Sequence, residues 1–460
     1  MPYTKLFPAD FLFGAATSSF QIEGHPLVDG AGPSIWTDFI QRKGAILNGD
    51  HANLACNHYE LWEQDIELMK QLGLKAYRLS ISWPRIMPEG EGEINQKGLD
   101  FYSNIIDKLI EAGIKPMVTL YHWDLPQALQ DKGGWTNPGI IDAFAHYSVV
   151  MNKALGDRVT DWITLNEPWV FMHLGMISGI HAPGIKDLGY AAKAYKNILL
   201  ASSKAISRMR SVNPDHMLGV TCDFTKFDAD SDSPADIMAM NKLHDYHNNL
   251  FVEPWFKGTI PESANTLFGP HGMKWSDDEL TNLVVPIDFL GVNYYRRNVA
   301  VAAKDGFLDA QTLPPEGIVT EMDWQVYPDG LYDVLKWVYD TCKVPLYVTE
   351  NGSAYDYPVV DGRVEDQLRT DYLKSHLEAC AKAIRDGVDL RGYYAWSLLD
   401  NFEWERGYSK RFGMIHVDYE TLERTIKDSG YCYRDLIRKH QAISSKAKNG
   451  KTVNDKIEAA

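Results

Sequence analysis

Residues 59–82 read YELWEQDIELMKQLGLKAYRLSIS, a helical pattern that passes directly into an apolar run. Trp62, Ile66 and Met69 recur at the spacing of one helix face. Gly73 follows them, and glycine after a helix favours the left-handed conformation that ends it. Residues 74–81 have the apolar character of a buried parallel strand. The stretch therefore predicts one helix-to-strand unit of an α/β fold.

The same unit recurs along the chain, at residues 101–123 (FYSNIIDKLIEAGIKPMVTLYHW) and 372–396 (YLKSHLEACAKAIRDGVDLRGYYAW), and more loosely at 153–168 and 332–352. Strands are predicted at roughly 11–17, 74–81, 116–121, 161–166, 217–223, 287–293, 345–349 and 391–396. Eight parallel strands with crossover helices predict a single (β/α)8 TIM barrel whose extended βα loops form a pocket. A doubly wound open sheet is the runner-up, although no GxGxxG follows a strand.

No Ser/Gly-rich or charged linker divides the chain, so one catalytic domain is expected over residues 1–443. Residues 444–460 (SSKAKNGKTVNDKIEAA) are polar and are predicted to form a mobile C-terminal tail. Residues 299–329 show little periodicity, which predicts a long loop.

The composition excludes several classes of partner. The chain has 460 residues and a formal net charge of −16, which argues against nucleic acid and anionic membrane surfaces as partners. Its 12% aromatic content, with 13 Trp and 24 Tyr, suits either a large core or surfaces that stack on sugar rings. The start, MPYTKLFPADFLFG, does not resemble a secretion signal, and no apolar run is long enough to span a membrane. Five widely spaced cysteines without a CxxC predict reduced thiols and a cytoplasmic location.

Two glutamates stand at the ends of predicted strands. Glu167 ends the fourth strand in TLNEPW, and Glu350 ends the seventh in YVTENG. Proline disfavours the helical conformation in the residue before it, so Glu167 is expected to be extended. Either motif alone is also typical of a strand that runs into a polar turn. The fourth and seventh strands of an eight-stranded ring lie nearly opposite, so together the motifs predict the paired carboxyl groups that glycoside cleavage needs.

From about Phe7 to Arg434 the chain resembles family 1 of the glycoside hydrolases, the β-glucosidase family. The matching segments are FLFGAATSSFQIEG (11–24), YRLSISWPRI (77–86), YHWDLPQAL (121–129), TLNEPW (164–169), DFLGVNYY (288–295), YVTENG (347–352) and WSLLDNFEWERGYSKRFG (396–413). The resemblance implies retaining hydrolysis of β-linked sugars without a metal or organic cofactor.

The resemblance also implies a role for individual residues. Glu167 corresponds to the general acid/base and Glu350 to the nucleophile, expected about 5–5.5 Å apart for a retaining enzyme. Arg78 and Tyr295 are expected beside the nucleophile, and Asn166 at the sugar 2-hydroxyl. Asn293 either binds the sugar or only completes the strand end.

Five further residues are expected to bind the sugar ring at the non-reducing end: Gln21, His122, Trp396, Glu403 and Trp404. Trp396 suits an apolar floor for the ring, with a core tryptophan as the alternative. Glu403 would repel a 6-phosphate, which favours an unphosphorylated sugar. On the leaving-group side, Trp169 is expected at the entrance. Asp223 departs from the family, which often has asparagine there.

These expectations favour a β-glucosidase that acts on terminal β-D-glucosyl residues of cello-oligosaccharides and aryl β-glucosides. A main preference for β-galactosides or β-fucosides is the alternative. A 6-phospho-β-glycosidase is less expected because of Glu403, and a non-catalytic sugar-binding protein because Glu167 and Glu350 are both present. A metal-dependent barrel hydrolase would show clustered His/Asp ligands after the first strand, where GAATSSFQIEG stands instead.

Overall fold

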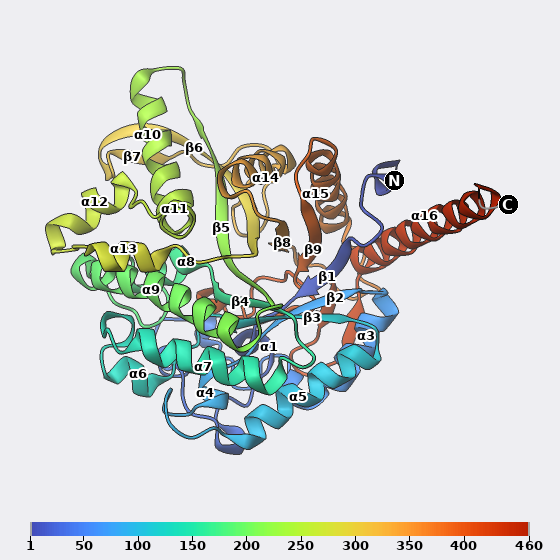
Figure 1. The fold of residues 1–460 in the computed structure, drawn as a ribbon, viewed down its shortest axis with the longest axis horizontal. Coiled ribbons are helices and arrows are strands. Elements are labelled where there is room, and N and C mark those ends of the chain that lie inside the picture. Colours follow the sequence, from blue (N-terminus) through green and yellow to red (C-terminus); the bar gives the residue numbers. More distant parts are fainter. Residues whose placement is uncertain (1, 459–460) are drawn as a thin grey trace.

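The computed structural model describes residues 2–458, with side chains from Tyr3 to Lys446, and a ring of parallel strands lies at its centre (Figure 1). The strands pair in the order β5-β4-β3-β2-β1-β9-β8-β6, and β5 also pairs with β6, which closes the ring. Their bounds are β1 (Leu12–Ala16), β2 (Ala76–Ser80), β3 (Lys115–Tyr121), β4 (Asp161–Asn166), β5 (Met217–Ala229), β6 (Phe289–Phe307), β8 (Leu346–Asn351) and β9 (Leu390–Trp396). This closed ring confirms the (β/α)8 prediction over the open sheet.

Helices cover the outside of the ring (Figure 1). The long ones are α3 (His58–Leu72), α5 (Gln96–Glu111), α7 (Ile140–Leu155), α9 (Leu188–Val212), α14 (Pro328–Cys342), α15 (Gln367–Arg385) and α16 (Asp428–Glu458). Between β5 and β6 the chain forms α10 (Pro234–His244), α11 (Leu250–Lys257), α12 (Glu262–Phe268) and α13 (Asp277–Leu283). Short helices α1 (Ser19–Ile22), α2 (Ile35–Phe39), α4 (Trp83–Ile86), α6 (Gln127–Asp131) and α8 (Pro168–Met172) lie in the loops, as does the hairpin of β10 (Ile415–Val417) and β11 (Arg424–Ile426).

The unit at residues 59–82 folds as its pattern predicts. Ile66 and Met69 of α3 are fully buried, and Trp62 packs against the same core. Gly73 ends the helix with φ 70°, where its N–H reaches the Lys70 carbonyl. The chain then enters β2, all of whose side chains are buried.

The predicted long loop at 299–329 is partly wrong. β6 continues to Phe307, and β7 (Ala310–Thr312) pairs with it in antiparallel fashion. The ladder between β5 and β6 extends to Ala229 and Ala300, and the Ala302 N–H donates to Asp236 of α10 at 2.9 Å. Pairing beyond the barrel and packing against α10 therefore hold a segment whose own pattern is weak.

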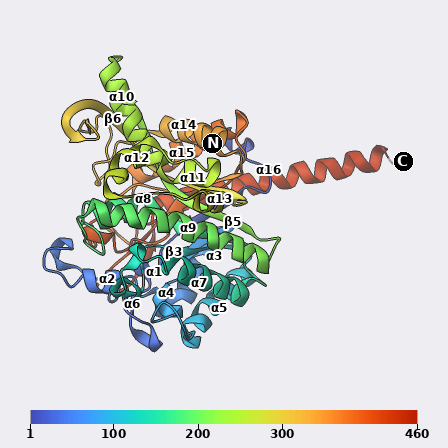
Figure 2. The ribbon, with the colours of Figure 1, turned by 60° about the vertical axis from the view of Figure 1, so that its left-hand side comes forward.

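The C-terminal helix crosses the predicted domain limit. α16 begins against the barrel, and its C-terminal part projects from the body in both views (Figure 1 and Figure 2). Residues 444–458 are therefore helical, while their mobility stays a prediction. Residues 459–460 lie outside the described residues.

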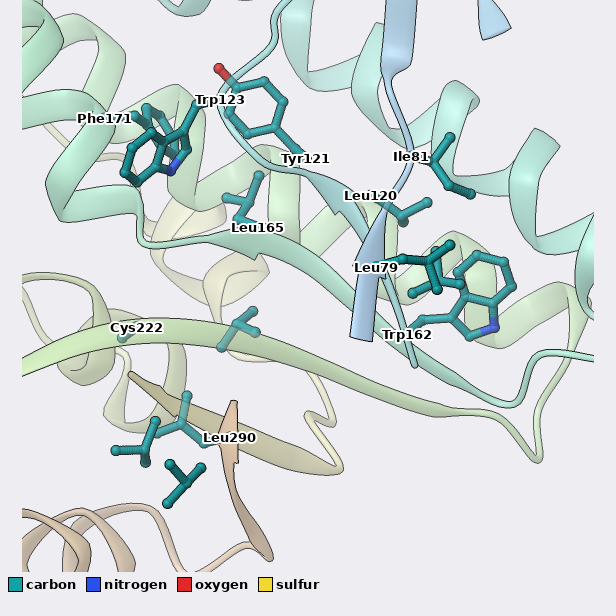
Figure 3. Close-up of a cluster of buried hydrophobic side chains, with 14 of the residues drawn as sticks. Leu79, Ile81, Leu120, Tyr121, Trp123, Trp162, Leu165, Phe171, Cys222 and Leu290 are labelled. Atoms are coloured by element: carbon teal, nitrogen blue, oxygen red, sulfur yellow. The ribbon is translucent and has the colours of Figure 1, made fainter. Parts of the chain in front are cut away.

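Alternate side chains of the strands enter two different buried clusters. Leu79, Leu120, Trp162 and Leu165 point from the strands toward the surrounding helices (Figure 3). Ile163, between two of them, belongs to a second cluster that takes its residues from most strands and fills the barrel interior. Within residues 2–458, no helix combines the length and the apolar character that a membrane crossing needs. All five cysteines are free thiols, as expected.

Candidate active site

Glu167 follows β4 directly and precedes the first residue of α8. Its backbone is left-handed, with φ 49° and ψ 64°, so the expected extended conformation is wrong. The Glu167 N–H donates to the Thr221 carbonyl of β5 at 2.9 Å, and the Glu167 carbonyl accepts from Val170 at 3.0 Å. These two bonds hold the turn from strand to helix in a region that is strained for a non-glycine residue. The turn leaves the carboxyl group buried, where it accepts from Asn293 Nδ2 at 2.7 Å.

Glu350 lies within β8, and both of its carboxylate oxygens have donors. Arg78 Nη1 of β2 approaches Oε1 at 2.5 Å, and the Tyr295 hydroxyl of β6 donates to Oε2 at 2.6 Å. The side chains of Arg78 and Glu350 are 0% and 4% exposed. Burial and the neighbouring Glu350 and Glu167 carboxyl groups raise the pKa of Tyr295 well above its usual value, so its hydroxyl remains a donor.

Arg78 links the two glutamates to the residues behind them. Its guanidinium also donates to Asn166 Oδ1 at 2.6 Å and to Thr119 Oγ1 at 3.1 Å. Asn166 Oδ1 accepts in addition from Asn293 Nδ2 at 3.2 Å. Arginine, the two asparagines and both carboxyl groups therefore form one buried network, which fixes side chains from β2, β4, β6 and β8 relative to one another.

The two glutamates have different electrostatic surroundings. Burial, Glu350 and Asp223 raise the pKa of Glu167 well above its usual value, against smaller opposing effects of Asn293 and Arg78. Burial also raises the pKa of Glu350, but Arg78 and the Tyr295 hydroxyl oppose it. Because the two groups interact, their titration belongs to the pair. The surroundings favour a proton on Glu167 and a charge on Glu350.

A cavity of about 410 Å³ lies over these glutamates at the carboxyl ends of the strands. Nine of the predicted site residues line it: His122, Glu167, Trp169, Asp223, Tyr295, Glu350, Trp396, Glu403 and Trp404. The other four, Gln21, Arg78, Asn166 and Asn293, are fully buried behind its wall. The structure thus brings all thirteen together, as nine residues that face the cavity and four that hold them.

The edge of the cavity formed by His122, Trp396 and Glu403 offers flat rings and hydrogen-bonding groups. The His122 ring is nearly parallel to the Trp396 ring, with centroids 5.9 Å apart. Burial and Arg78 lower the pKa of His122 well below its usual value, so the imidazole is neutral. Its Nδ1 has no partner among the described residues, which leaves it for a ligand hydroxyl. Gln21 Nε2 reaches Glu403 at 3.4 Å and so orients that carboxyl group.

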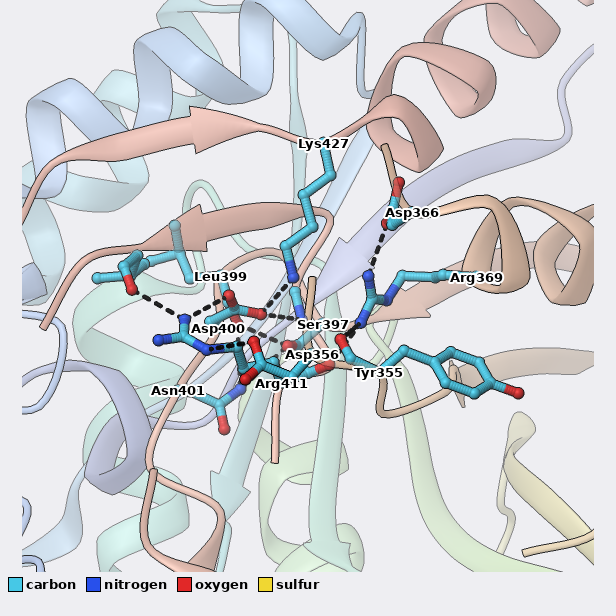
Figure 4. Close-up of polar contacts among 12 residues, drawn as sticks. Tyr355, Asp356, Asp366, Arg369, Ser397, Leu399, Asp400, Asn401, Arg411 and Lys427 are labelled. Carbon is cyan, nitrogen blue, oxygen red and sulfur yellow. Dashed lines mark hydrogen bonds and ion pairs between the residues drawn. The ribbon is translucent and has the colours of Figure 1, made fainter. Parts of the chain in front are cut away.

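The segment before Glu403 is held by a group of ion pairs around Asp400 (Figure 4). Asp400 Oδ1 accepts from Lys427 Nζ at 2.7 Å, and Oδ2 accepts from Arg411 at 2.8 Å. The Asp400 and Lys427 side chains are both fully buried. This charged anchor lies three residues before Glu403, and it belongs to the fold rather than to the cavity.

The sequence profile of Glycosyl hydrolase family 1 matches residues 3–442. The chain belongs to this family. It is 47% identical over 437 residues to Beta-glucosidase A of Thermotoga maritima, a match that covers 94% of this chain and 98% of the relative. It is 46% identical over 442 residues to the 1,4-beta-D-glucan glucohydrolase of Thermotoga neapolitana, which covers 94% of this chain and 98% of that one. The solved family 1 β-glucosidase of Thermotoga maritima superposes with a TM-score of 0.93 at 46% identity, over 94% of this chain and 98% of that one. The protein is therefore a glycoside hydrolase of family 1.

Several residues of this family 1 site were not predicted from the sequence. His247 pairs with Asp223 at 2.8 Å, and its ring centroid lies 4.0 Å from that of Trp169. Trp324, which lines the cavity, falls in the segment predicted as a loop. Arg296 also lines the cavity, and its position directly after the NYY motif was the one signal that could have found it.

His181 lies at the cavity and has a carboxylate partner. Its Nε2 pairs with Glu405 Oε2 at 2.6 Å, and both residues line the cavity. The sequence leaves Asn293 open between a contact with the sugar and a role at the strand end. The structure gives His181 a carboxylate partner, and it places Asn293 against Glu167.

Proposed function

We propose that this family 1 hydrolase is a retaining β-glucosidase that removes terminal β-D-glucosyl residues from cello-oligosaccharides and aryl β-glucosides. The observation that carries the proposal is the unequal environment of two buried carboxyl groups over one cavity. Glu350 is held by an arginine and a tyrosine hydroxyl, whereas Glu167 has one amide donor and two carboxylate neighbours. The names of the relatives in Thermotoga maritima and Thermotoga neapolitana support it.

In the first step, an ionised Glu350 oxygen attacks the anomeric carbon while the bond to the leaving oxygen breaks. Glu167 gives its proton to that oxygen, so the leaving group departs neutral. The product is a glucose ester of Glu350, and the negative charge that raised the pKa of Glu167 is gone. Glu167 then takes a proton from water, and the water oxygen displaces Glu350 from the anomeric carbon. Two displacements restore the β configuration.

Glucose is placed in this proposal by groups around both faces of the ring. Trp396 provides a flat apolar floor, and His122 Nδ1 is free for a hydroxyl. The contact of Asn166 with the 2-hydroxyl stays a prediction, because in this structure the residue is fully buried and bonded to Arg78 and His122. Glu403, oriented by Gln21, binds the far hydroxyls and offers no cation to a 6-phosphate.

The leaving group occupies the side of the cavity formed by Trp169 and Asp223 in this proposal. Trp169 follows Glu167 by two residues at the start of α8, and Asp223 of β5 is close enough to raise the pKa of Glu167, which supports this position. A role in the breakdown of cellulose-derived sugars and a cytoplasmic location remain part of the proposal. The first follows from the substrate and the second from cysteines that form no disulfide.

The experiment compares kcat/KM on matched nitrophenyl β-D-glucoside, β-D-galactoside, β-D-fucoside and 6-phospho-β-D-glucoside, with Glu350→Ala alongside. The proposal expects cleavage of the glucoside, none of the phosphorylated sugar, and loss of activity by several orders of magnitude in the variant. NMR of the first-formed sugar should show the β anomer. Faster cleavage of the galactoside or fucoside would make that sugar, and not glucose, the main substrate. Cleavage of the phosphosugar alone would overturn the role of Glu403. No reaction with any of the four would favour a sugar-binding protein.

A further inference from the structure

One cation in the cavity has no hydrogen-bond or ion-pair partner among the described side chains. Arg296 of β6 is half-buried and lines the cavity. Its guanidinium lies 5.2 Å from the ring centroid of Trp324, in the position of a cation–π contact. Among residues 3–446, whose side chains the structure describes, none forms a hydrogen bond or ion pair with this guanidinium. Arginine always carries its charge, so this group presents up to five unused donors to whatever occupies the cavity.

The other charged groups of the cavity are already engaged. The pairs are Glu350 with Arg78 at 2.5 Å, Asp223 with His247 at 2.8 Å, Glu405 with His181 at 2.6 Å, and Arg406 with Glu405 at 3.1 Å. Burial raises the pKa of both Glu167 and Glu403 well above the usual value, which favours their neutral forms. The cation of Arg296 is therefore the charge that a ligand would neutralise.

Arg296 lies on the leaving-group side. Asp223 of β5 pairs with Asn293 of β6, three residues before Arg296, and Asp223 and Glu167 are the charged groups that act on its guanidinium, so it lies on the side of the acid/base. Trp169, Met322 and Trp324 line the same cavity and provide flat or apolar contacts. An aromatic ring that leaves from glucose would thus meet apolar walls and one unpaired cation.

We propose that Arg296 binds a carboxylate carried by an aromatic leaving group, so that glucosides of hydroxyaryl carboxylic acids are preferred ligands. The inference rests on the proposed function, because it places glucose in the inner part of the cavity. The planar fork of a guanidinium matches both oxygens of a carboxylate, and the contact with Trp324 holds that plane. With a net charge of −16, the protein as a whole does not attract anions. A preference for the carboxylate over its neutral analogue therefore has to come from this local cation.

The test measures Kd by calorimetry, with the complete protein, for the 1-thio-β-D-glucosides of 3- and 4-mercaptobenzoic acid, in which sulfur replaces the phenolic oxygen, and of the corresponding mercaptobenzamides. The thio linkage slows cleavage, and the acid and amide differ only in charge. In the wild type, the acid of at least one isomer should bind about tenfold more tightly than its amide, because hydrogen bonds to charged groups are the stronger ones. This ratio should fall toward one in Arg296→Met, remain partly in Arg296→Lys, and decrease with added salt.

Arg406→Gln is the matched control, because Arg406 lines the cavity but is paired with Glu405. It should keep the wild-type ratio. A wild-type ratio of one or less, or a ratio that survives in Arg296→Met, would overturn the inference. Cleavage of nitrophenyl β-D-glucoside by the same wild-type preparation tests the proposed function separately, since the Kd ratio does not depend on turnover.

Discussion

Replacing Arg78 by methionine keeps an unbranched side chain in the barrel but removes the guanidinium that faces Glu350. The pair is buried, with 0% and 4% of the two side chains exposed, so water does not substitute freely for the lost donor. Arg78 is also the largest of the effects that oppose the burial-induced rise in the pKa of Glu350. In Arg78→Met the pKa of Glu350 must therefore rise further.

The size of the rise has an upper bound. Removing one partner of a buried ion pair costs about 3–5 kcal/mol. One pKa unit corresponds to about 1.36 kcal/mol, so the rise would reach about 2–4 units if the whole cost fell on ionised Glu350. The Tyr295 hydroxyl still donates to Glu350 at 2.6 Å and stabilises its ionised form, which makes the rise in pKa smaller. We expect a rise of at least about one unit, and kcat/KM below the new pKa should then fall at least about tenfold.

The assay is the pH profile of kcat/KM on nitrophenyl β-D-glucoside, which reports the ionisation of the free enzyme. Glu350 must be charged to attack, so its higher pKa moves the acid limb of the profile to higher pH. Arg78→Lys, which keeps the charge without the fork, should lie between wild type and Arg78→Met. Arg85→Met is the control, because it breaks a different buried pair, with Glu23 at 3.0 Å, that does not involve Glu167 or Glu350. An acid limb of Arg78→Met that coincides with the wild-type limb would refute the reasoning.

Three further changes test other parts of the site. Tyr295→Phe removes a hydrogen bond to a charged oxygen, worth about 1.5–3 kcal/mol, so kcat/KM should fall about 10–100-fold with a small upward shift of the acid limb; an unchanged rate would contradict the role of this hydroxyl. Asp223→Asn removes a charge that raises the pKa of Glu167, so the alkaline limb should move to lower pH, by about one unit or less, and a limb that stays or rises would count against it. Lys427→Met removes one of the cations that pair with the buried Asp400 carboxylate and should lower the free energy of unfolding by about 3–5 kcal/mol. An unfolding temperature that calorimetry finds unchanged would exclude a stabilising role for this ion pair.

The barrel could be predicted because most of its units are local. Residues 59–82 contain the helix, the glycine that ends it and the strand, so periodicity alone locates them. The extension of β5 and β6 could not be predicted in this way. It depends on a ladder between residues more than 70 positions apart, from Lys226–Arg297 to Ala229–Ala300, and on Asp236 of α10.

The site was predictable where a motif ends a strand and hidden where tertiary packing decides. Glu167 and Glu350 could be placed from the strand ends. The backbone of Glu167 could not, because the preference of a residue before proline is overridden by the bond of its N–H to Thr221 on β5. Arg296 and His247 had no pattern of their own, since their role depends on what the barrel brings beside them.

Closure of the barrel is what separates the chemistry of the two glutamates. Glu350 on β8 depends on Arg78 from β2, which crosses the interior, and on Tyr295 from the adjacent β6. Among the described side chains, Glu167 after β4 has one donor, the amide of Asn293 on β6, which the β5–β6 pairing brings within 2.7 Å. In an open sheet, β2 and β8 would lie too far apart for this ion pair. The same ring that joins the two carboxyl groups therefore gives one of them a cation and leaves the other to hold its proton.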